Sequence, residues 1–422
     1  MKAVAAALGL FIFTWPPFAA GAGEPMTVAR AMIDAARPAV CPGGLADARG
    51  LAARLGYGGV SGPDRRGWLA LEDSQRGRLS LAERRRGDRL DGYELQADVA
   101  IAGTFRPVMM ARLAADCAQV LARAIDRDAA GRARALADLG PDLRVQGAWQ
   151  PLDPPVPAGA DPGGVRVAHI DSGVNYLLPA VAGRLARTAD GAILGWDFWD
   201  DDPRPFDFNP SGSPFFPLRH GTAVASILLT EAPGASLVPF RFPRPDMTRM
   251  AALVDAAAAA GAAVVMVPMG SNRRADWRAF AEAAARHPKL LFVVSAGNDG
   301  RDIDAVPVYP AALDLANMLV VTSADAFGRL AAGSNWGANG VDVMVPGEGV
   351  AVTDHRGAGG KASGSSFAVP RLAALAARLK ARHPDWHAAE LIAAIKKRAA
   401  PPLMRGGAVV RFGWIANPLD DG

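Results

Sequence analysis

Short apolar runs alternate with amphipathic stretches over the C-terminal part of the chain. The apolar runs are four to six residues long, the length of buried strands: Val165–Ile170, Leu237–Phe240, Ala263–Val267, Leu290–Val294 and Met318–Thr322. Helical periodicity marks the stretches Gly221–Leu229, Met247–Ala260, Asp276–Ala285, Phe367–Arg382 and His387–Lys397. Strands that alternate with helices predict a mostly parallel sheet with helices on both faces. The fold class is therefore a three-layer α/β/α domain over residues 165–417.

The N-terminal third has a mixed pattern. Helical periodicity is present at Val28–Ala36, Leu45–Leu55 and Pro107–Ile125, whereas Tyr93–Ile101 alternates like a strand and Trp68–Leu71 is a short apolar run. This combination predicts a small α+β domain over residues 24–149. Residues 150–164 are rich in Pro and Gly and lack periodicity, so they are predicted to be a linker between two domains.

Charge is nearly balanced along the chain. The 422 residues carry 46 basic and 42 acidic side chains, a formal net charge of +4, and half of the residues are hydrophobic. The run Arg84–Arg86 is interrupted by nearby acids and has no interleaved aromatic residues, so it predicts a solvated face and no nucleic-acid partner.

Residues 1–22 have the pattern of a secretory signal peptide. Lys2 precedes an apolar stretch from Ala3 to Trp15, and small residues suited to cleavage follow at positions 19–22. We therefore expect a secreted or periplasmic protein with no membrane span after signal removal. In an oxidising compartment, the two cysteines, Cys41 and Cys117, are predicted to form one disulfide within the N-terminal domain.

Polar residues suited to acyl transfer stand at the ends of predicted elements. Asp171 follows a strand, and His220 and Ser366 each stand at the start of a helix. These residue types could act as orienting acid, general base and nucleophile. Asn298 follows another strand in a Gly-bounded turn and could donate a hydrogen bond to an oxyanion. Each residue also has a structural interpretation, as turn residue, core histidine or helix cap.

Four blocks of sequence together resemble the subtilisin-like serine proteases, the subtilase family (peptidase S8). They occur in the family's order: Asp171–Asn175, His220–Ala225, Ala296–Asn298 and Gly364–Pro370. The resemblance covers roughly residues 165–417 and leaves the N-terminal third outside it.

This resemblance implies a serine endopeptidase with an Asp171, His220 and Ser366 triad, and the signal peptide predicted above makes it a secreted one. Asn298 and the backbone N–H of Ser366 would stabilise the tetrahedral intermediate. A peptide or protein substrate would lie along Pro268, Met269 and Gly270, and the facing wall of its pocket would be formed by Ser295, Ala296 and Gly297. No cofactor is required for this chemistry.

Three points stay open. Pro268 stands where relatives usually have Ser, and Ala223 and Ser226 alter the helix after His220, so the alternative is a catalytically impaired peptide-binding pseudoprotease. The N-terminal domain is either a prosegment that is removed or a retained accessory domain. The third point is a metal site. Before His220 the chain has a run of acids that is either a solvated acidic loop, the favoured interpretation, or a structural Ca²⁺ site. These acids are Asp197, Asp200, Asp201, Asp202 and Asp207.

Overall fold

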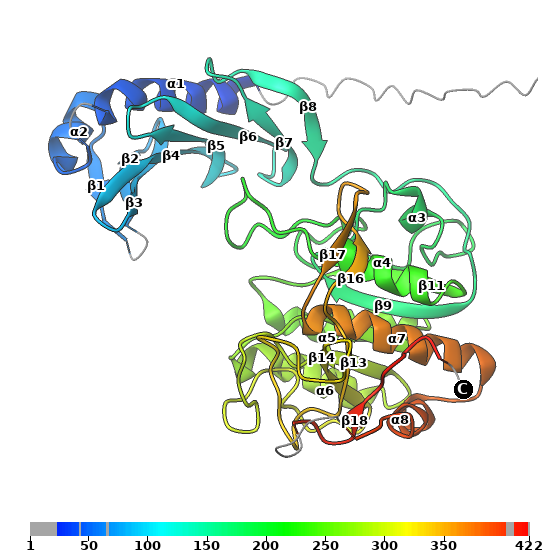
Figure 1. Ribbon diagram of the computed structural model, residues 1–422. Coiled ribbons are helices and arrows are strands. Elements are labelled where there is room, and N and C mark those ends of the chain that lie inside the picture. Colours follow the sequence, from blue (N-terminus) through cyan, green and yellow to red (C-terminus); the bar gives the residue numbers. More distant parts are fainter. Residues whose placement is uncertain (1–22, 42–43, 65–66, 402–408, 421–422) are drawn as a thin grey trace, which may run out of the picture. The chain divides into compact units, whose positions relative to one another are not determined.

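The computed structural model describes residues 23–41, 44–64, 67–401 and 409–420 (Figure 1). The predicted signal peptide, residues 1–22, lies outside the described residues. The chain divides into two compact units after Gln150.

The first unit is an antiparallel sheet with two helices. Its eight strands pair in chain order, from β1 to β8. The elements are α1 (Gly23–Val40), α2 (Ala48–Leu55), β1 (Gly59–Ser61), β2 (Leu69–Asp73), β3 (Gly77–Arg86), β4 (Arg89–Ile101), β5 (Thr104–Ala114), β6 (Gln119–Arg127), β7 (Ala133–Leu139) and β8 (Val145–Pro151). Alternate residues of the central strands face α1, and Ile33 of that helix and Leu95 of β4 are fully buried in the shared core.

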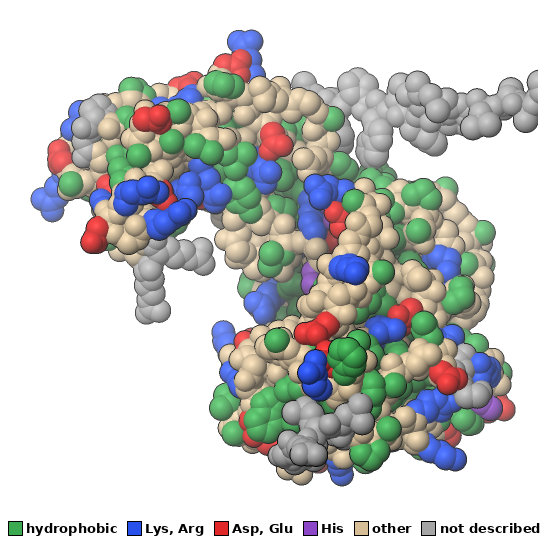
Figure 2. Space-filling view, in the orientation of Figure 1, with side chains coloured by type: hydrophobic (Ala, Val, Ile, Leu, Met, Phe, Trp, Pro, Cys, Tyr) green, Lys and Arg blue, Asp and Glu red, His purple; other side chains and the backbone are tan. Residues whose placement is uncertain are grey.

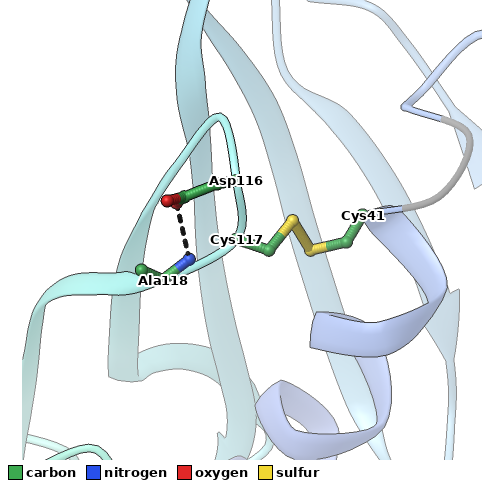
Figure 3. Close-up of a disulfide and its surroundings, with 4 residues drawn as sticks. All are labelled: Cys41, Asp116, Cys117 and Ala118. Carbon is green, nitrogen blue, oxygen red and sulfur yellow. Dashed lines mark hydrogen bonds between the residues drawn. A yellow bond between two sulfur atoms is a disulfide. The ribbon is translucent and has the colours of Figure 1, made fainter.

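A disulfide joins the end of α1 to the turn between β5 and β6. The Cα atoms of Cys41 and Cys117 are 5.9 Å apart, and the two residues are separated by 76 positions in the sequence (Figure 3). Beside it, Asp116 accepts a hydrogen bond from the N–H of Ala118 at 3.0 Å. The predicted pairing of the two cysteines is present in the structure.

The predicted helix over Pro107–Ile125 is wrong. The segment forms the hairpin of β5 and β6, and the turn contains Cys117 with a φ of 69°. Its Ala, Leu and Met residues favour helices, but pairing with β4 buries alternate side chains, among them Met109 and Leu113, under α1. Tertiary pairing has overridden local propensity here.

The second unit contains a parallel sheet of eight strands in the order β10-β11-β9-β12-β13-β14-β15-β18. The strands are β9 (Val165–Asp171), β10 (Trp196–Asp197), β11 (Ala235–Arg241), β12 (Val264–Val267), β13 (Leu291–Ser295), β14 (Met318–Ala324), β15 (Val343–Pro346) and β18 (Gly413–Trp414). A separate hairpin consists of β16 (Val350–Thr353) and β17 (Gly359–Ala362). The five strands predicted from apolar runs are all present, with bounds shifted by at most two residues.

Helices cover both faces of this sheet. They are α3 (Pro179–Ala182), α4 (Gly221–Glu231), η1 (Met247–Arg249), α5 (Met250–Ala259), η2 (Arg274–Trp277), α6 (Arg278–Arg286), α7 (Ser365–Arg382) and α8 (Ala388–Lys396). Helices α4, α7 and α8 contribute to the core on one face, and α5 and α6 contribute to the core on the other. The predicted three-layer α/β/α architecture is confirmed.

Residues 152–161, which the sequence predicts to be linker, are anchored within the second unit. The buried Tyr176 donates its hydroxyl to the carbonyl oxygen of Pro154 at 2.6 Å. Arg204 binds both carboxylate oxygens of Asp153. The carbonyl oxygen of Pro157 accepts a hydrogen bond from an arginine side chain at 2.8 Å. We call residues 152–161 the N-terminal strap of the second unit.

The surface mixes charges of both signs. On the face that Figure 2 draws, Lys and Arg side chains are interspersed with Asp and Glu. Within the described ranges, no helix combines the length and hydropathy needed to span a bilayer.

Candidate active site

Strand β9 and helix α4 bring Asp171 and His220 together. Asp171 ends β9, and His220 occupies the N-cap of α4. The His220 Nδ1 atom lies 2.7 Å and 3.0 Å from the two carboxylate oxygens of Asp171. The Asp171 side chain exposes 5% of its surface and the His220 side chain 34%. Because a carboxylate only accepts hydrogen bonds, Nδ1 carries the proton and Nε2 of neutral His220 is free to act as a base.

Electrostatics favour the protonated form of His220. Its partial burial opposes a positive charge, but the Asp171 carboxylate outweighs that effect and raises the pKa of His220 above its ordinary value. The imidazolium that forms during proton transfer is thereby stabilised.

A buried polar network holds the two elements together. Ser172 donates its hydroxyl to Asp207 at 2.6 Å and accepts the N–H of Gly221 at 3.0 Å. Thr222 donates both its N–H and its hydroxyl to the other carboxylate oxygen of Asp207. Burial alone would raise the pKa of Asp207, but the nearby His355 imidazole and these hydroxyl donors lower it. The sequence shows Asp207 only as part of an acidic run, and this bridging position was missed.

Ser366 lies in the first turn of α7, after a glycine in an unusual conformation. Gly364 has a φ of 134°, and a Cβ there would lie 3.1 Å from the Asn298 side chain. The Ser366 hydroxyl donates to the carbonyl oxygen of Pro268 at 2.9 Å. The next residue, Phe367, has its ring centroid 5.7 Å from that of His220. Helix α7 therefore brings Phe367, the neighbour of Ser366, against His220 and directs the Ser366 hydroxyl to Pro268.

Asn298 is oriented by Ser365. Its side-chain oxygen accepts the N–H of Ser365 at 2.8 Å and the Ser365 hydroxyl at 2.9 Å. With the oxygen so engaged, the amide nitrogen of Asn298 is available as a donor to another group. Ser365 is fully buried, whereas Ser366 is partly exposed. This difference favours Ser366 as the residue that meets a substrate.

The segments predicted to bind substrate lie at the ends of β12 and β13, two neighbouring strands of the sheet. Pro268 follows the last paired residue of β12, so its missing N–H breaks no ladder bond. The following Met269 and Gly270 are partly exposed and exposed. On the facing segment, the side chains of Ser295 and Ala296 are buried and Gly297 is partly exposed. The Ser295 hydroxyl lies 2.6 Å from the Ser365 hydroxyl, so the Ser295 side chain is engaged within the core.

The sequence model described as "Subtilase family" matches residues 163–414, which contain all of these residues. The chain belongs to the subtilase family. A thermophilic serine proteinase from Bacillus sp. (strain AK1) is 31% identical to it over 230 residues, 51% of this chain and 52% of that relative. Thermitase from Thermoactinomyces vulgaris is 28% identical over 231 residues, 52% of this chain and 76% of thermitase. This chain thus spans about half the length of the Bacillus enzyme.

The fold of this subtilase is also that of solved structures. A cold-adapted subtilisin-like serine proteinase superposes with a TM-score of 0.50 and 24% identity, covering 64% of this chain and 94% of the other. At this identity the likeness shows the fold alone.

The acidic run of this subtilase is not a solvated loop. Asp197, Asp202 and Asp207 are buried, because arginines and hydroxyl groups satisfy their carboxylates. Arg241 binds Asp197 at 2.7 Å and also binds Asp200, and Asp202 pairs with Arg204. The sequence interpretation failed because Arg241 follows Asp197 by 44 positions and Asp200 by 41, so only the fold shows that it pairs with them. Among the described residues, no three acidic, His or Cys side chains gather as metal ligands would.

Proposed function

We propose that this subtilase is a secreted serine endopeptidase. The observation that carries the proposal is the 2.7 Å contact between His220 Nδ1 and Asp171, with Ser366 presented at the start of α7. His220 Nε2 would take the proton of the Ser366 hydroxyl as this attacks a peptide carbonyl carbon, and would return it to the leaving amine. Asp171 fixes the tautomer throughout and stabilises the imidazolium.

The negative charge on the tetrahedral intermediate needs donors. We infer that the amide nitrogen of Asn298 and the backbone N–H of Ser366 provide them, since the Asn298 oxygen is already held by Ser365. The N–H of Ser366 is one of the free N–H groups of the first turn of α7, where the helix dipole also favours negative charge. No cofactor takes part in these steps.

The substrate class follows from the backbone around the site. The segment Met269–Gly270, which is partly exposed at Met269 and exposed at Gly270, continues β12, so an extended peptide could pair with it through main-chain hydrogen bonds. Such pairing accepts many sequences, which suits a protein or peptide substrate.

Ser366→Ala is the decisive variant. We expect it to abolish hydrolysis of a denatured protein substrate and labelling by a fluorophosphonate, because both need an activated hydroxyl. Ser365→Ala is the matched control, since its hydroxyl is buried against Asn298 and it should still be labelled. Full hydrolysis by Ser366→Ala would overturn the proposed mechanism.

The impaired peptide-binding protein remains the alternative function. It is favoured by one observation, the hydrogen bond that the Ser366 hydroxyl donates to Pro268 in place of His220. Nucleophile and base often come into contact only when substrate is bound, so this arrangement suits both functions. Labelling of the wild-type protein by fluorophosphonate separates them, because only a working triad reacts.

The first unit is proposed to be either a prosegment or an accessory domain. The N-terminal strap supports a cut before Leu152 if cleavage occurs, because Asp153 and Pro154 are bonded into the second unit. N-terminal sequencing of the protein from culture medium or periplasm tests both the cleavage and the proposed export. A structural Ca²⁺ ion is tested by comparing thermal unfolding in chelator and in added calcium.

A further inference from the structure

A second histidine lies beneath the Asp171–His220 pair. His169 precedes Asp171 by two positions in β9, so both side chains point to the same face of the sheet. It is fully buried, and its Nε2 atom lies 3.0 Å from the carbonyl oxygen of Gly221 and 3.9 Å from a carboxylate oxygen of Asp171. Gly221 directly follows His220, so His169 contacts the strand end and the helix start at once.

The contact with Gly221 determines the state of the ring. A carbonyl oxygen only accepts hydrogen bonds, so Nε2 of His169 is the protonated nitrogen and donates to it. Burial lowers the pKa of His169 and outweighs the Asp171 carboxylate, which would raise it. The lowered pKa keeps the His169 ring neutral. The titratable groups that face it are Asp171 on its own strand, His220 at the start of α4 and Asp207 in the loop before α4.

The other ring nitrogen has no such partner. Nδ1 of His169 is buried and makes no hydrogen bond with any of the described residues. A buried acceptor without a donor lowers stability, and an aliphatic side chain at this position would avoid that loss. His169 thus stabilises the core less than an aliphatic residue would, and we attribute its role to the hydrogen bond that it donates to the Gly221 carbonyl oxygen.

That bond acts at a close approach between the start of α4 and the segment around the end of β9. A Cβ on Gly221 would lie 2.0 Å from the carbonyl oxygen of Gly173 and 3.1 Å from the Asp171 side chain. This tight packing therefore allows the start of α4 only one position relative to the end of β9. Ser172 fixes this position from one side through the N–H of Gly221, and His169 fixes it from the other through the carbonyl oxygen.

We propose that His169 is a positioning residue that sets the distance between Asp171 and His220 by holding the carbonyl group of Gly221. The proposal rests on the triad proposed above. Without the bond, α4 can shift away from β9, the Asp171–His220 contact lengthens, and His220 loses part of the stabilisation of its protonated form. A displacement of about 1 Å at a catalytic group can lower turnover on the order of 100-fold.

The test compares two substitutions of His169. His169→Val removes both ring nitrogens and suits a buried strand, whereas His169→Gln can still donate from its amide nitrogen to Gly221. Val167→Ala is the matched control, because Val167 lies on the same face of β9 and is fully buried, and its aliphatic side chain has no group that could bond the Gly221 carbonyl oxygen. Each is made in the active protein and in a Ser366→Ala background.

In the active protein we expect His169→Val to lower kcat at least about tenfold with KM little changed, and to move the acid limb of kcat/KM to lower pH. His169→Gln should stay within about threefold of the wild type in kcat. Val167→Ala should lower the melting temperature without moving the acid limb, whereas His169→Val should not lower the melting temperature.

In the Ser366→Ala background, the pKa of His220 is measured by NMR. It should fall in His169→Val and stay in place in His169→Gln. This readout needs no hydrolysis, so it decides the role of His169 even if the wild-type protein fails to cleave peptides or to react with fluorophosphonate. An unchanged His220 pKa in His169→Val, or an equal fall in both variants, would overturn the proposal.

Discussion

Loss of the Arg241 side chain should strongly destabilise the second unit. It ends β11, beside Asp171 in the sheet, and its guanidinium binds the carboxylates of Asp197 and Asp200. It also lies over the Trp199 ring, 4.9 Å from the centroid. Arg241→Met keeps the apolar stem of the side chain and removes the charge.

The expected loss follows from the burial of the partners. The side chains of Arg241 and Asp197 expose only 3% of their surfaces, whereas Asp200 exposes 30% and can turn toward solvent. Removing one member of a buried ion pair leaves an uncompensated charge and costs about 3–5 kcal/mol. The free energy of unfolding of a domain is about 5–15 kcal/mol, so Arg241→Met should leave the second unit only marginally stable.

The loss of stability in Arg241→Met should depend on pH. In the wild type, burial raises the pKa of Asp197 to about 6, although the Arg241 charge opposes this. In Arg241→Met the opposing charge is absent, so the pKa of Asp197 in the folded state must rise further above its value in the unfolded chain. Asp197 therefore binds a proton more tightly in the folded variant than in the unfolded chain. Its stability is then lost as the pH rises through the folded pKa. The difference between the two proteins should shrink as the pH falls from 8 toward about 6 and stay small below that, where Asp197 is protonated in both folded states.

Urea unfolding at pH 8 and pH 5 measures this, in a Ser366→Ala background to prevent self-cleavage. Arg356→Met is the control, because Arg356 exposes 84% of its side chain in its pair with Asp354 and its loss should change stability by less than about 0.5 kcal/mol. A loss below about 1 kcal/mol for Arg241→Met at pH 8 would refute the assigned role of this ion pair.

Three further substitutions test the site and its support. Asp171→Asn should lower kcat on the order of 10⁴-fold and move the acid limb of kcat/KM to lower pH, since the carboxylate raises the His220 pKa; pH–rate profiles check this. Asn298→Ala should lower kcat on the order of 10²–10³-fold in steady-state kinetics with KM unchanged, because its donor acts on a charge absent from the bound substrate. Tyr176→Phe should lower the free energy of unfolding by about 1–3 kcal/mol in urea titrations, because it leaves the buried carbonyl group of Pro154 without its donor.

The second unit was predictable because its signals are local. A buried parallel strand must be a continuous apolar run, so β9 and β13 were located from their own residues. Catalytic groups in such sheets stand at the carboxyl ends of strands and at helix starts, and Asp171 and His220 occupy such positions. The first unit lacked such signals, since the hairpin of β5 and β6 consists of residues that also favour helices.

The polar network around the site could not be predicted from local pattern. Asp207 lies 35 positions after Ser172 and 15 before Thr222, and only the fold shows that it bonds to both. The same reason explains His169, which stands in an apolar run and looks like a core residue until the start of α4 is placed over it. The chain thus specifies its candidate catalytic groups by position at element ends. Their mutual geometry depends on buried partners whose pairing exists only after the sheet has formed.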